Sequence, residues 1–398
     1  MTAMESVIVA GVGMHAWGKF PNKSFVDLGV CAVLEALADA GIQWKQVQSL
    51  HAACNVHSGV AGLLAGNELA YALGETGSRI TSSFNGCASS GIALRQAFVD
   101  VASGACDIAV AAGAQKSAEG FLAELPCLVP VPLDFEHLRW QAVGAANPAY
   151  WALECRKRMV QYGTTEEDLA EIKVILSKHG ANNPRARYRK VFTREEVLRS
   201  PMVADPLRLL EVCAVSDGAA AVVLCNRKTA DRLSAKKVYL RAVAVAGSIF
   251  GDPTIRIPFL SAPANHDGLA NSESVTSARA AYEMAGIDPA DTDAVELPDN
   301  SAWHVLEYLE SLGMCRRGEA EKLVRDRAIA IGGDLPVCPS GGFACLGEVV
   351  SAQGLAQMFE LTSQLRGAAG TRQVEGAKLA VAQTLGAMGN SATFVLTR

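Results

Sequence analysis

Residues 32–50 read AVLEALADAGIQWKQVQSL, and residues 277–295 read SARAAYEMAGIDPADTDAV. Each stretch contains a helical pattern, an Ala-Gly-Ile stop and a spacer, and a constant offset of 245 residues separates them (32 to 277). Glycine directly after a helical pattern is typical of a helix C-terminus. Self-similarity of this kind predicts a fold built from two similar halves.

A second, weaker correspondence points the same way. Residues 91–114 and 354–387 each contain a helix, a stop with glycine, and a strand, DIAVAAGA in one and KLAVAQTLGA in the other. Short apolar strands alternating with helices are typical of α/β layering with buried strands. The sequence predicts helices over 26–40 and 88–102, and strands over 6–11, 107–112, 219–224, 237–245, 378–382 and 392–396.

Residues 118–205 break this pattern. The stretch contains prolines at positions 126, 130, 132, 148 and 184, three helical stretches and several basic residues. We interpret it as an insertion in the first half that covers the functional site, although an ordinary set of surface helices is the alternative. The predicted domains are therefore an N-terminal half (1–117 and 206–232), an inserted loop domain (118–205) and a C-terminal half (233–398).

Composition excludes several classes of protein. The chain is 50% apolar but only 6% aromatic, with 36 glycines among 398 residues, so it predicts a core of small residues rather than disorder. Apolar stretches such as 105–114 and 241–250 are too short to cross a bilayer. The N-terminus lacks a cationic lead, so we expect a first strand there and no signal peptide. A net charge of −5 gives no general attraction to nucleic acid or membranes.

The eleven cysteines are scattered and contain no C-x-x-C pair. We therefore expect a reducing cytoplasm, no disulfide framework and no metal site.

One of the eleven cysteines differs from the rest in its surroundings. Cys87 lies in TSSFNGCASSG (81–91), directly before the predicted helix over 88–102. Backbone N–H groups and the helix dipole would stabilise a thiolate there, which makes Cys87 a candidate nucleophile. The alternative is a small buried hydrophobic residue, as we expect for the other ten cysteines.

Three blocks together resemble the thiolase superfamily, especially its sterol-carrier-protein-type branch. They read NGCASSG (85–91), PMVADPLRLLEVCAVSDGAAAVVL (201–224) and CPSGGFACLGEVVSAQGLAQMFELTSQLRG (338–367). The resemblance implies an α/β thiolase fold with five layers, α-β-α-β-α, made of two similar halves with an inserted loop domain. It also implies a homodimer and acyl-CoA chemistry in which Cys87 is acylated. Coenzyme A would be a co-substrate, and no cofactor would be covalently bound.

The chain departs from the family pattern around the nucleophile. Thiolases carry a Gly-His-Pro block whose histidine activates the cysteine, but this chain reads Gly347-Glu348-Val349. A His-Asp-Cys-Phe block is usual in this branch, whereas residues 298–305 read PDNSAWHV. Thiolases also carry a cysteine or histidine near the C-terminus, before the closing glycine loop. Here that stretch reads QTLGAMGN (383–390), and none of its side chains can serve as an acid in place of a thiol. The sequence thus predicts that the nucleophile is kept while the acid/base set is rebuilt.

Glu348 occupies the position of the family's base. It could accept the thiol proton, although its charge would raise the pKa of Cys87, so Glu348 could instead work in its protonated form or through a water molecule. The alternative is a glutamate in a surface loop. His304 could donate to the thioester oxygen or simply cap a helix. Cys87, Gly386 and His304 are the candidate oxyanion hole, in which Gly386 belongs to a late glycine loop that could equally be a tight turn.

Further candidates lie around these residues. Asp299 and Asn300 are expected to support the catalytic side chains. Ser340, Gly341 and Gly342 resemble the family's small-residue block along the pantetheine path. Arg185 and Arg187, within the basic run 185–190, could meet the phosphates of coenzyme A, or could form a solvated basic face. No phosphate-binding loop or dinucleotide fingerprint is present.

The resemblance implies an acyl-CoA C-acyltransferase that cleaves a 3-oxoacyl-CoA with coenzyme A. Because the usual acid/base pair is replaced, we expect a branched or aromatic substrate of the benzoylsuccinyl-CoA kind. Relatives with rebuilt sites often work with a small accessory subunit that bears a zinc finger and an OB fold. Two other hypotheses are a thiolase-like retro-aldol lyase acting on a steroid side-chain CoA ester, and a non-catalytic thiolase-like subunit.

Overall fold

The computed structural model describes residues 6–117, 147–233, 236–247, 272–386 and 389–398. Its main sheet has nine strands in the order β3-β2-β4-β7-β1-β8-β11-β10-β9. The elements up to β4 are β1 (Val7–Gly18), α1 (Phe25–Ala40), β2 (Ser49–Ala53), α2 (Gly59–Leu63), α3 (Ala65–Leu73), β3 (Arg79–Ser83), α4 (Ser89–Ala102) and β4 (Ile108–Gln115). The central elements are α6 (Asn147–Tyr162), α7 (Glu166–Ala181), α8 (Arg194–Leu198), β5 (Met202–Ala204), β6 (Leu207–Arg208), β7 (Asp217–Asn226) and α9 (Arg227–Ala230). The remainder are β8 (Val238–Gly247), α10 (Glu273–Ala285), β9 (Ala294–Glu296), α11 (Ala302–Ser311), α12 (Ala320–Arg325), α13 (Gly342–Leu346), α14 (Gln353–Arg366), β10 (Leu379–Gly386) and β11 (Asn390–Thr397).

The sheet consists of two half-sheets. The first is β3-β2-β4-β7-β1, and the second is β8-β11-β10-β9. They join where β1 and β8 pair antiparallel through Ile8 with Tyr239 and Val9 with Val238. In each half-sheet parallel pairs lie toward the outer edge and antiparallel pairs toward the junction.

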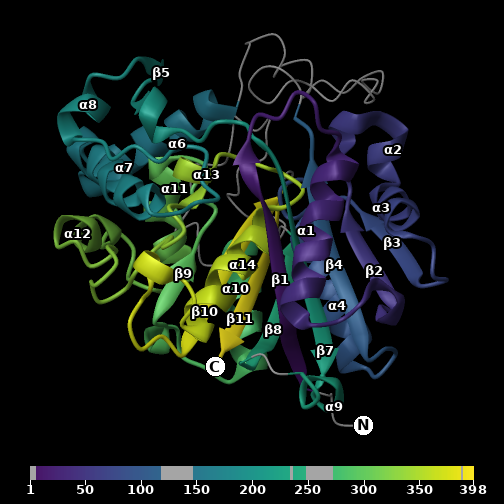
Figure 1. Cartoon of the computed structure of the whole chain (residues 1–398). Helices are drawn as coiled ribbons and strands as arrows, with labels where there is room; N and C mark the ends of the chain where they lie inside the picture. The colour runs from purple at the N-terminus through teal and green to yellow at the C-terminus, as the bar shows by residue number, and fades with distance from the viewer. Residues whose placement is uncertain (1–5, 118–146, 234–235, 248–271, 387–388) are drawn as a thin grey trace.

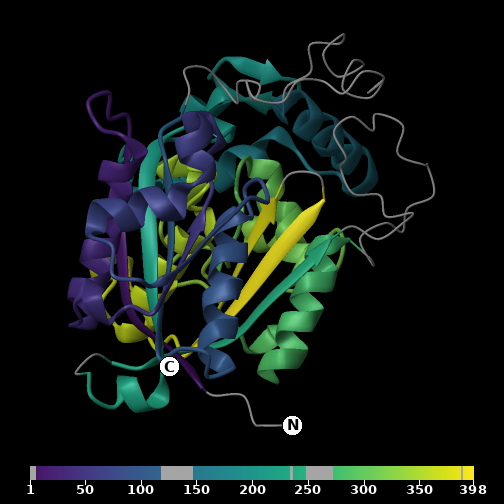
Figure 2. The same ribbon diagram turned by 90° about the vertical axis from the view of Figure 1, so that its right-hand side faces the viewer.

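Helices fill three layers around these half-sheets. One core cluster contains α4 and α14 together with strands of both halves, so these two helices form the central layer. A second cluster packs α1 and α3 on the other face of the first half-sheet. A third packs α10 and α11 on the outer face of the second. Figure 1 shows α1 along the first strands, and Figure 2 shows green α10 beside the yellow strands β10 and β11. The layer order α-β-α-β-α confirms the predicted fold class.

The two halves repeat local structure at the predicted offset. Helix α1 ends at Gly41 and α10 ends at Gly286, and both glycines have a left-handed φ of 68°. A short 3₁₀ helix follows each, then β2 in one half and β9 in the other. The second correspondence holds as well, because α4 leads to β4 and α14 leads to β10. Glycine is required at both helix ends because other residues rarely adopt this conformation.

The excess of small residues allows close packing of helix on strand. A Cβ atom on Gly13 would lie 2.2 Å from the Ala32 carbonyl oxygen, and one on Gly11 would lie 2.1 Å from the Ala36 carbonyl oxygen. Both contacts are with the backbone of α1, so β1 and α1 touch directly along this line. Bulkier residues on either element would separate them and open the core.

The described part of residues 118–205 contains α6, α7 and α8, which Figure 1 shows grouped on one side of the molecule. Residues 118–146 lie outside the described part, so the predicted domain boundaries remain a prediction. Buried Arg158 on α6 donates to Glu310 of α11 and to Glu321 of α12, which ties this segment to the second half. None of the described helices is both long and apolar enough to cross a membrane.

Candidate active site

Cys87 lies in a tight turn at the start of α4. Ser89 holds the turn, because its hydroxyl donates to the Gly86 carbonyl at 2.6 Å and accepts from the Asn85 N–H at 2.7 Å. Gly86 has a φ of 58°, which lets the chain reverse between strand and helix. Cys87 as a whole residue is half-buried, so the turn leaves part of it open to solvent.

Glu348 contacts the candidate nucleophile directly. The Cys87 thiol donates to Glu348 Oε1 at 3.3 Å. Glu348 is only 2% exposed, which rules out the alternative of a glutamate in a surface loop. Its backbone is fixed as well, since its N–H donates to Ala214 and its carbonyl accepts from Ser216. The sequence-predicted pair of nucleophile and carboxylate is therefore brought together.

Burial and charge shift the pKa values of this pair in the same direction. Burial raises the pKa of the Cys87 thiol well above its usual range, and the Glu348 carboxylate raises it further, while the N–H of Cys87 lowers it. Burial also raises the pKa of Glu348, although hydrogen bonds from Cys87 and its other neighbours lower it in part. Both groups thus hold their protons more tightly than in water.

Two further side chains, which the sequence did not predict for the site, contact the Glu348 carboxylate. The amide of Gln353, the first residue of α14, donates to Oε1 at 2.9 Å. The thiol of Cys213 donates to Oε2 at 3.7 Å. Both residues lie inside blocks that carry the thiolase resemblance, but no motif marks them. Gln353 follows Glu348 by five residues, whereas Cys213 meets Glu348 only after the two halves have packed.

The candidates expected to support the catalytic groups have separate positions. Asn300 is in the Glu348 network: its amide donates to the carboxylate and, at 3.7 Å, to the sulfur of Cys213. Asp299 instead accepts from the backbone N–H groups of Phe343 and Ala344 at the start of α13, at 2.7 and 3.0 Å. Burial raises the pKa of Asp299 to about 7, against the effect of these N–H groups.

His304 lies on the first turn of α11, in an aromatic cluster. Its Nδ1 atom is 2.8 Å from the Ser301 hydroxyl, and its ring packs edge-on against Trp151 and Trp303 and stacks on Tyr308. Burial lowers the pKa of His304 to about 3, so the imidazole is neutral. A neutral ring can still donate one hydrogen bond, and its predicted place in the oxyanion hole stays a prediction.

Gly386 lies at the end of β10, next to the turn that carries the nucleophile. A Cβ atom at this position would lie 2.3 Å from the carbonyl oxygen of Asn85, two residues before Cys87. Only glycine permits this approach of two backbones. Residues 387–388 of the late glycine loop lie outside the described part, so the oxyanion hole of Cys87 and Gly386 also stays a prediction.

The expected coenzyme A contacts have structural partners of their own. The Ser340 hydroxyl donates to Glu296 at 3.0 Å. Gly341 and Gly342 have left-handed φ values of 91° and 61° and pack against Gly180 and Asp299, respectively.

The two candidate arginines also make internal contacts. Arg185 pairs with Glu35 at 2.5 Å, and Arg187 donates to the Val215 carbonyl at 2.7 Å. Both side chains therefore connect elements of the fold. Phosphate binding by these two arginines stays a prediction, as does the place of Ser340, Gly341 and Gly342 along the pantetheine path.

The expectation that the other ten cysteines are small buried residues is wrong for Cys31, and Cys315 is only half-buried. Cys31 is exposed on α1, since it lies on the face turned away from β1. Cys213 is buried, but it is also a hydrogen-bond partner of Glu348. Cys127 lies outside the described residues.

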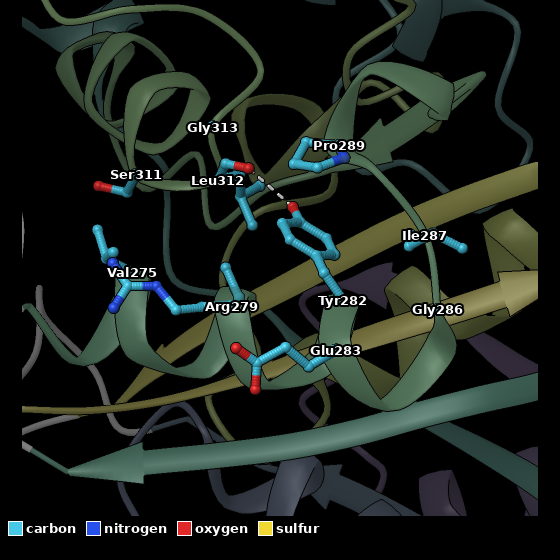
Figure 3. Close-up of a pocket in the computed structure, with 11 residues that line it drawn as sticks. Val275, Arg279, Tyr282, Glu283, Gly286, Ile287, Pro289, Ser311, Leu312 and Gly313 are labelled. Atoms are coloured by element: carbon cyan, nitrogen blue, oxygen red, sulfur yellow. Dashed lines mark hydrogen bonds between the residues drawn. The ribbon is translucent and has the colours of Figure 1, made fainter.

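A pocket of about 450 Å³ opens elsewhere, between the C-terminal half of α10 and the end of α11 (Figure 3). Tyr282 lies at its centre and donates to the Leu312 carbonyl at 2.8 Å. Arg279 and Glu283 are among the residues that line it. None of the candidate catalytic residues lines this pocket.

Comparisons with known proteins agree with this geometry. The family model described as thiolase, N-terminal domain, matches residues 7–124, and the model described as thiolase C-terminal domain-like matches residues 262–398. The acetyl-CoA acetyltransferase of Methanothermobacter thermautotrophicus is 35% identical over 395 residues, which is 98% of each chain. The benzoylsuccinyl-CoA thiolase subunit BbsB of Thauera aromatica is 33% identical over 94% of this chain and 93% of that one.

Among solved structures, the Ltp2-ChsH2(DUF35) aldolase matches with a TM-score of 0.83 and 26% identity, over 98% of each chain. The chain belongs to the thiolase family and is an acyl-CoA acyltransferase of that family.

Proposed function

We propose that the protein is a thiolase that cleaves a 3-oxoacyl-CoA with coenzyme A through an acyl intermediate on Cys87. The observation that carries this proposal is the 3.3 Å contact between the Cys87 sulfur and Glu348 Oε1 at the start of α4. A nucleophile next to a proton acceptor at a helix N-terminus is the arrangement that covalent acyl transfer requires.

In the first half-reaction the Cys87 proton passes to Glu348 and the sulfur attacks the 3-keto carbon. The bond between C2 and C3 then breaks, and its electron pair goes to C2 of the leaving CoA ester. Protonated Glu348 is the nearest acid that can return the proton to that carbon. Backbone N–H groups at Cys87 and Gly386, together with the His304 ring, would hold the negative oxygen. In the second half-reaction the thiol of coenzyme A gives its proton to Glu348 and its sulfur attacks the acyl group; the Cys87 sulfur leaves and takes that proton back from Glu348.

The carboxylate changes the charge balance relative to a histidine base. Before the reaction the pair carries one negative charge, on Glu348; after proton transfer it carries one, on the Cys87 sulfur. The charge therefore moves by one hydrogen bond without a second charge entering the buried site. This supports Glu348 as a base even though its charge raises the pKa of Cys87.

The substrate class and assembly follow from the relatives. We propose a branched or aromatic 3-oxoacyl-CoA of the benzoylsuccinyl-CoA type, which the 33% identity to the BbsB subunit supports. A homodimer with a small accessory subunit, bearing a zinc finger and an OB fold, is the proposed assembly. The solved aldolase that resembles this chain is by its title a complex with a DUF35 protein, which supports such a partner. The ten described cysteines are free thiols, which supports a cytoplasmic location.

Retro-aldol cleavage of a steroid side-chain CoA ester is the second candidate. It is favoured by the aldolase match, at 26% identity over 98% of each chain. Such a reaction needs a base, which Glu348 could supply, but no acyl-cysteine. A non-catalytic subunit is the remaining alternative, and the nucleophile–carboxylate contact speaks against it.

One experiment separates these functions. The protein, alone and with its accessory subunit, is incubated with aromatic and straight-chain 3-oxoacyl-CoA esters, and peptides are mapped by mass spectrometry. We expect an acyl adduct on Cys87 that disappears when coenzyme A is added, and none in Cys87→Ala. Full carbon–carbon cleavage by Cys87→Ala would reject the thiolase mechanism in favour of the aldolase. Absence of cleavage in every form would leave the non-catalytic subunit.

A further inference from the structure

Four donors surround one buried carboxylate. Glu348 Oε1 accepts from Cys87 and from Gln353, at 3.3 and 2.9 Å. Oε2 accepts from Cys213 at 3.7 Å, and Asn300 also donates to the carboxylate. Of these donors only Cys87 is partly accessible; Cys213, Gln353 and Asn300 are buried.

The direction of these hydrogen bonds is fixed by chemistry. A side-chain amide can only donate to a carboxylate through its NH₂ group, so the orientation of Gln353 is set. Asn300 donates to the sulfur of Cys213, which turns the Cys213 proton toward Glu348 Oε2. A carboxylate offers about four lone-pair positions. Gln353 donates to the same oxygen as Cys87, and Cys213 donates to the other, so a proton arriving from Cys87 at Oε1 meets a carboxylate whose Oε2 already accepts from Cys213.

We propose that Gln353 and Cys213 are positioning residues that direct the base Glu348 at Cys87 and keep it ionised. This inference rests on the role of Glu348 in the proposed function. Both residues act through the Glu348 carboxylate, to which each donates a hydrogen bond. Each acts by stabilising the carboxylate form, which balances the burial that would otherwise leave Glu348 protonated and unable to accept the Cys87 proton.

The titratable groups that face Glu348 from the packed elements are few. Cys87 faces it from the turn before α4, and Cys213 faces it from the segment before β7. Asp299 lies near enough to Cys213, and Tyr308 near enough to Cys87, to interact through space. Removing a donor to Glu348 therefore changes a coupled pair of Cys87 and Glu348, whose titration is read as one profile.

The test is the pH profile of Cys87 alkylation by iodoacetamide, read by peptide mass mapping, in Cys213→Ala, Cys213→Ser and Gln353→Leu. Loss of a donor makes the Glu348 carboxylate more basic, so it holds the Cys87 proton more tightly. We therefore expect the midpoint of the alkylation profile to shift to higher pH by on the order of one unit in Cys213→Ala and Gln353→Leu. Cys213→Ser keeps a donor and should restore the wild-type midpoint. The rising limb of the acyl-transfer profile should shift in the same direction.

Gln357→Leu is the matched control. Gln357 is also buried on α14, but its amide donates to the Gln383 carbonyl, so its midpoint should equal that of the wild type. Unshifted profiles in folded Cys213→Ala and Gln353→Leu would overturn the proposal, as would an equal shift in Cys213→Ala and Cys213→Ser. If Gln353→Leu does not fold, the comparison of Cys213→Ala with Cys213→Ser tests the proposal on its own. Alkylation needs no substrate, so a shifted profile without any acyl adduct would reject the proposed function while the positioning role stands.

Discussion

At the scale of single residues, the site depends on one negative charge shared by Cys87 and Glu348. The carboxylate both accepts the thiol proton and opposes the thiolate through its charge. These two effects can be separated by substitution, because a glutamine at position 348 keeps the shape and removes the charge.

We therefore expect Glu348→Gln to act in opposite directions on reactivity and catalysis. Alkylation of Cys87 at pH 8 should be faster than in the wild type, because the pKa of the thiol falls when the neighbouring charge is lost. Acyl transfer, measured as kcat/KM, should fall by about 10² to 10⁴, because the base is lost. Glu375→Gln, at an exposed glutamate, is the control and should change neither rate. Slower alkylation together with unchanged acyl transfer would contradict the assigned role of Glu348.

The aromatic cluster around His304 predicts an acid sensitivity of folding. The folded pKa of this imidazole is about 3, against an ordinary value of 6.5, so only the unfolded chain gains its proton between these values. Its contribution to stability is complete above pH 6.5 and decreases as the pH falls from 6.5 toward 3. His304→Phe keeps an aromatic ring in the cluster and removes the titration.

Between pH 7.5 and 5.5 the wild type should lose about 1.4 kcal/mol more unfolding free energy than His304→Phe. This value follows because pH 5.5 lies one unit below 6.5, the pKa of the unfolded imidazole, and one unit corresponds to about 1.4 kcal/mol. Urea unfolding at both pH values measures the difference. Equal losses in the two proteins would show that His304 is protonated in the folded state, which its burial opposes.

At the scale of elements, the sequence predicts most of the fold because its signals are local. Apolar runs and the glycines after α1 and α10 mark strands and helix ends within a few residues, so their positions agree with the structure. Cys87 is found in the same way, since the turn and the start of α4 are adjacent in sequence.

Gln353 follows Glu348 by only five residues, but no sequence pattern shows that its side chain turns back to the carboxylate. Cys213 could not be found from the sequence for a different reason. Cys213 reaches Glu348 across 135 positions, and Cys87 reaches it across 261, so the network exists only when both halves are packed. The family block locates Glu348, but it says nothing about which side chains surround its carboxylate. The arginines at 185 and 187 show the same limit, because their charges are paired or bonded by distant elements.

The contact of β1 with α1 can be tested at one glycine. In Gly13→Ala the new methyl group would lie 2.2 Å from the Ala32 carbonyl oxygen and 2.4 Å from the Ala36 nitrogen, and backbone atoms cannot move aside as a side chain can. We expect a loss of about 3 kcal/mol in unfolding free energy, measured by urea denaturation. Gly247→Ala, where a Cβ meets nothing within 4 Å, should stay within about 0.5 kcal/mol of the wild type. Equal stability of the two variants would mean that α1 can shift on the sheet.

At the scale of the whole molecule, one edge of the sheet has the features of an interface. Strand β3 ends the order of described strands and pairs with β2 alone. Exposed apolar side chains lie beside it, namely Val60 on α2, Tyr71 on α3 and Phe84 after β3. An open strand edge next to apolar surface favours pairing with another chain. We therefore expect the proposed homodimer to pair through this edge.

Charge at this edge should separate the subunits. Tyr71 is 76% exposed, so Tyr71→Glu costs little in a monomer but places a carboxylate in the proposed interface, where it loses its water. We expect sedimentation velocity to show a dimer for the wild type and a dissociation constant at least about tenfold higher for Tyr71→Glu, since 1.4 kcal/mol gives that factor. Val160→Glu is the control: Val160 is 82% exposed on α6, which Figure 1 places on the opposite side of the molecule, and its dimer should be unchanged. Cys87 follows β3 by only a few residues, so loss of the dimer should also slow acyl transfer. Full activity of a monomeric Tyr71→Glu variant would show that the active site does not depend on this interface.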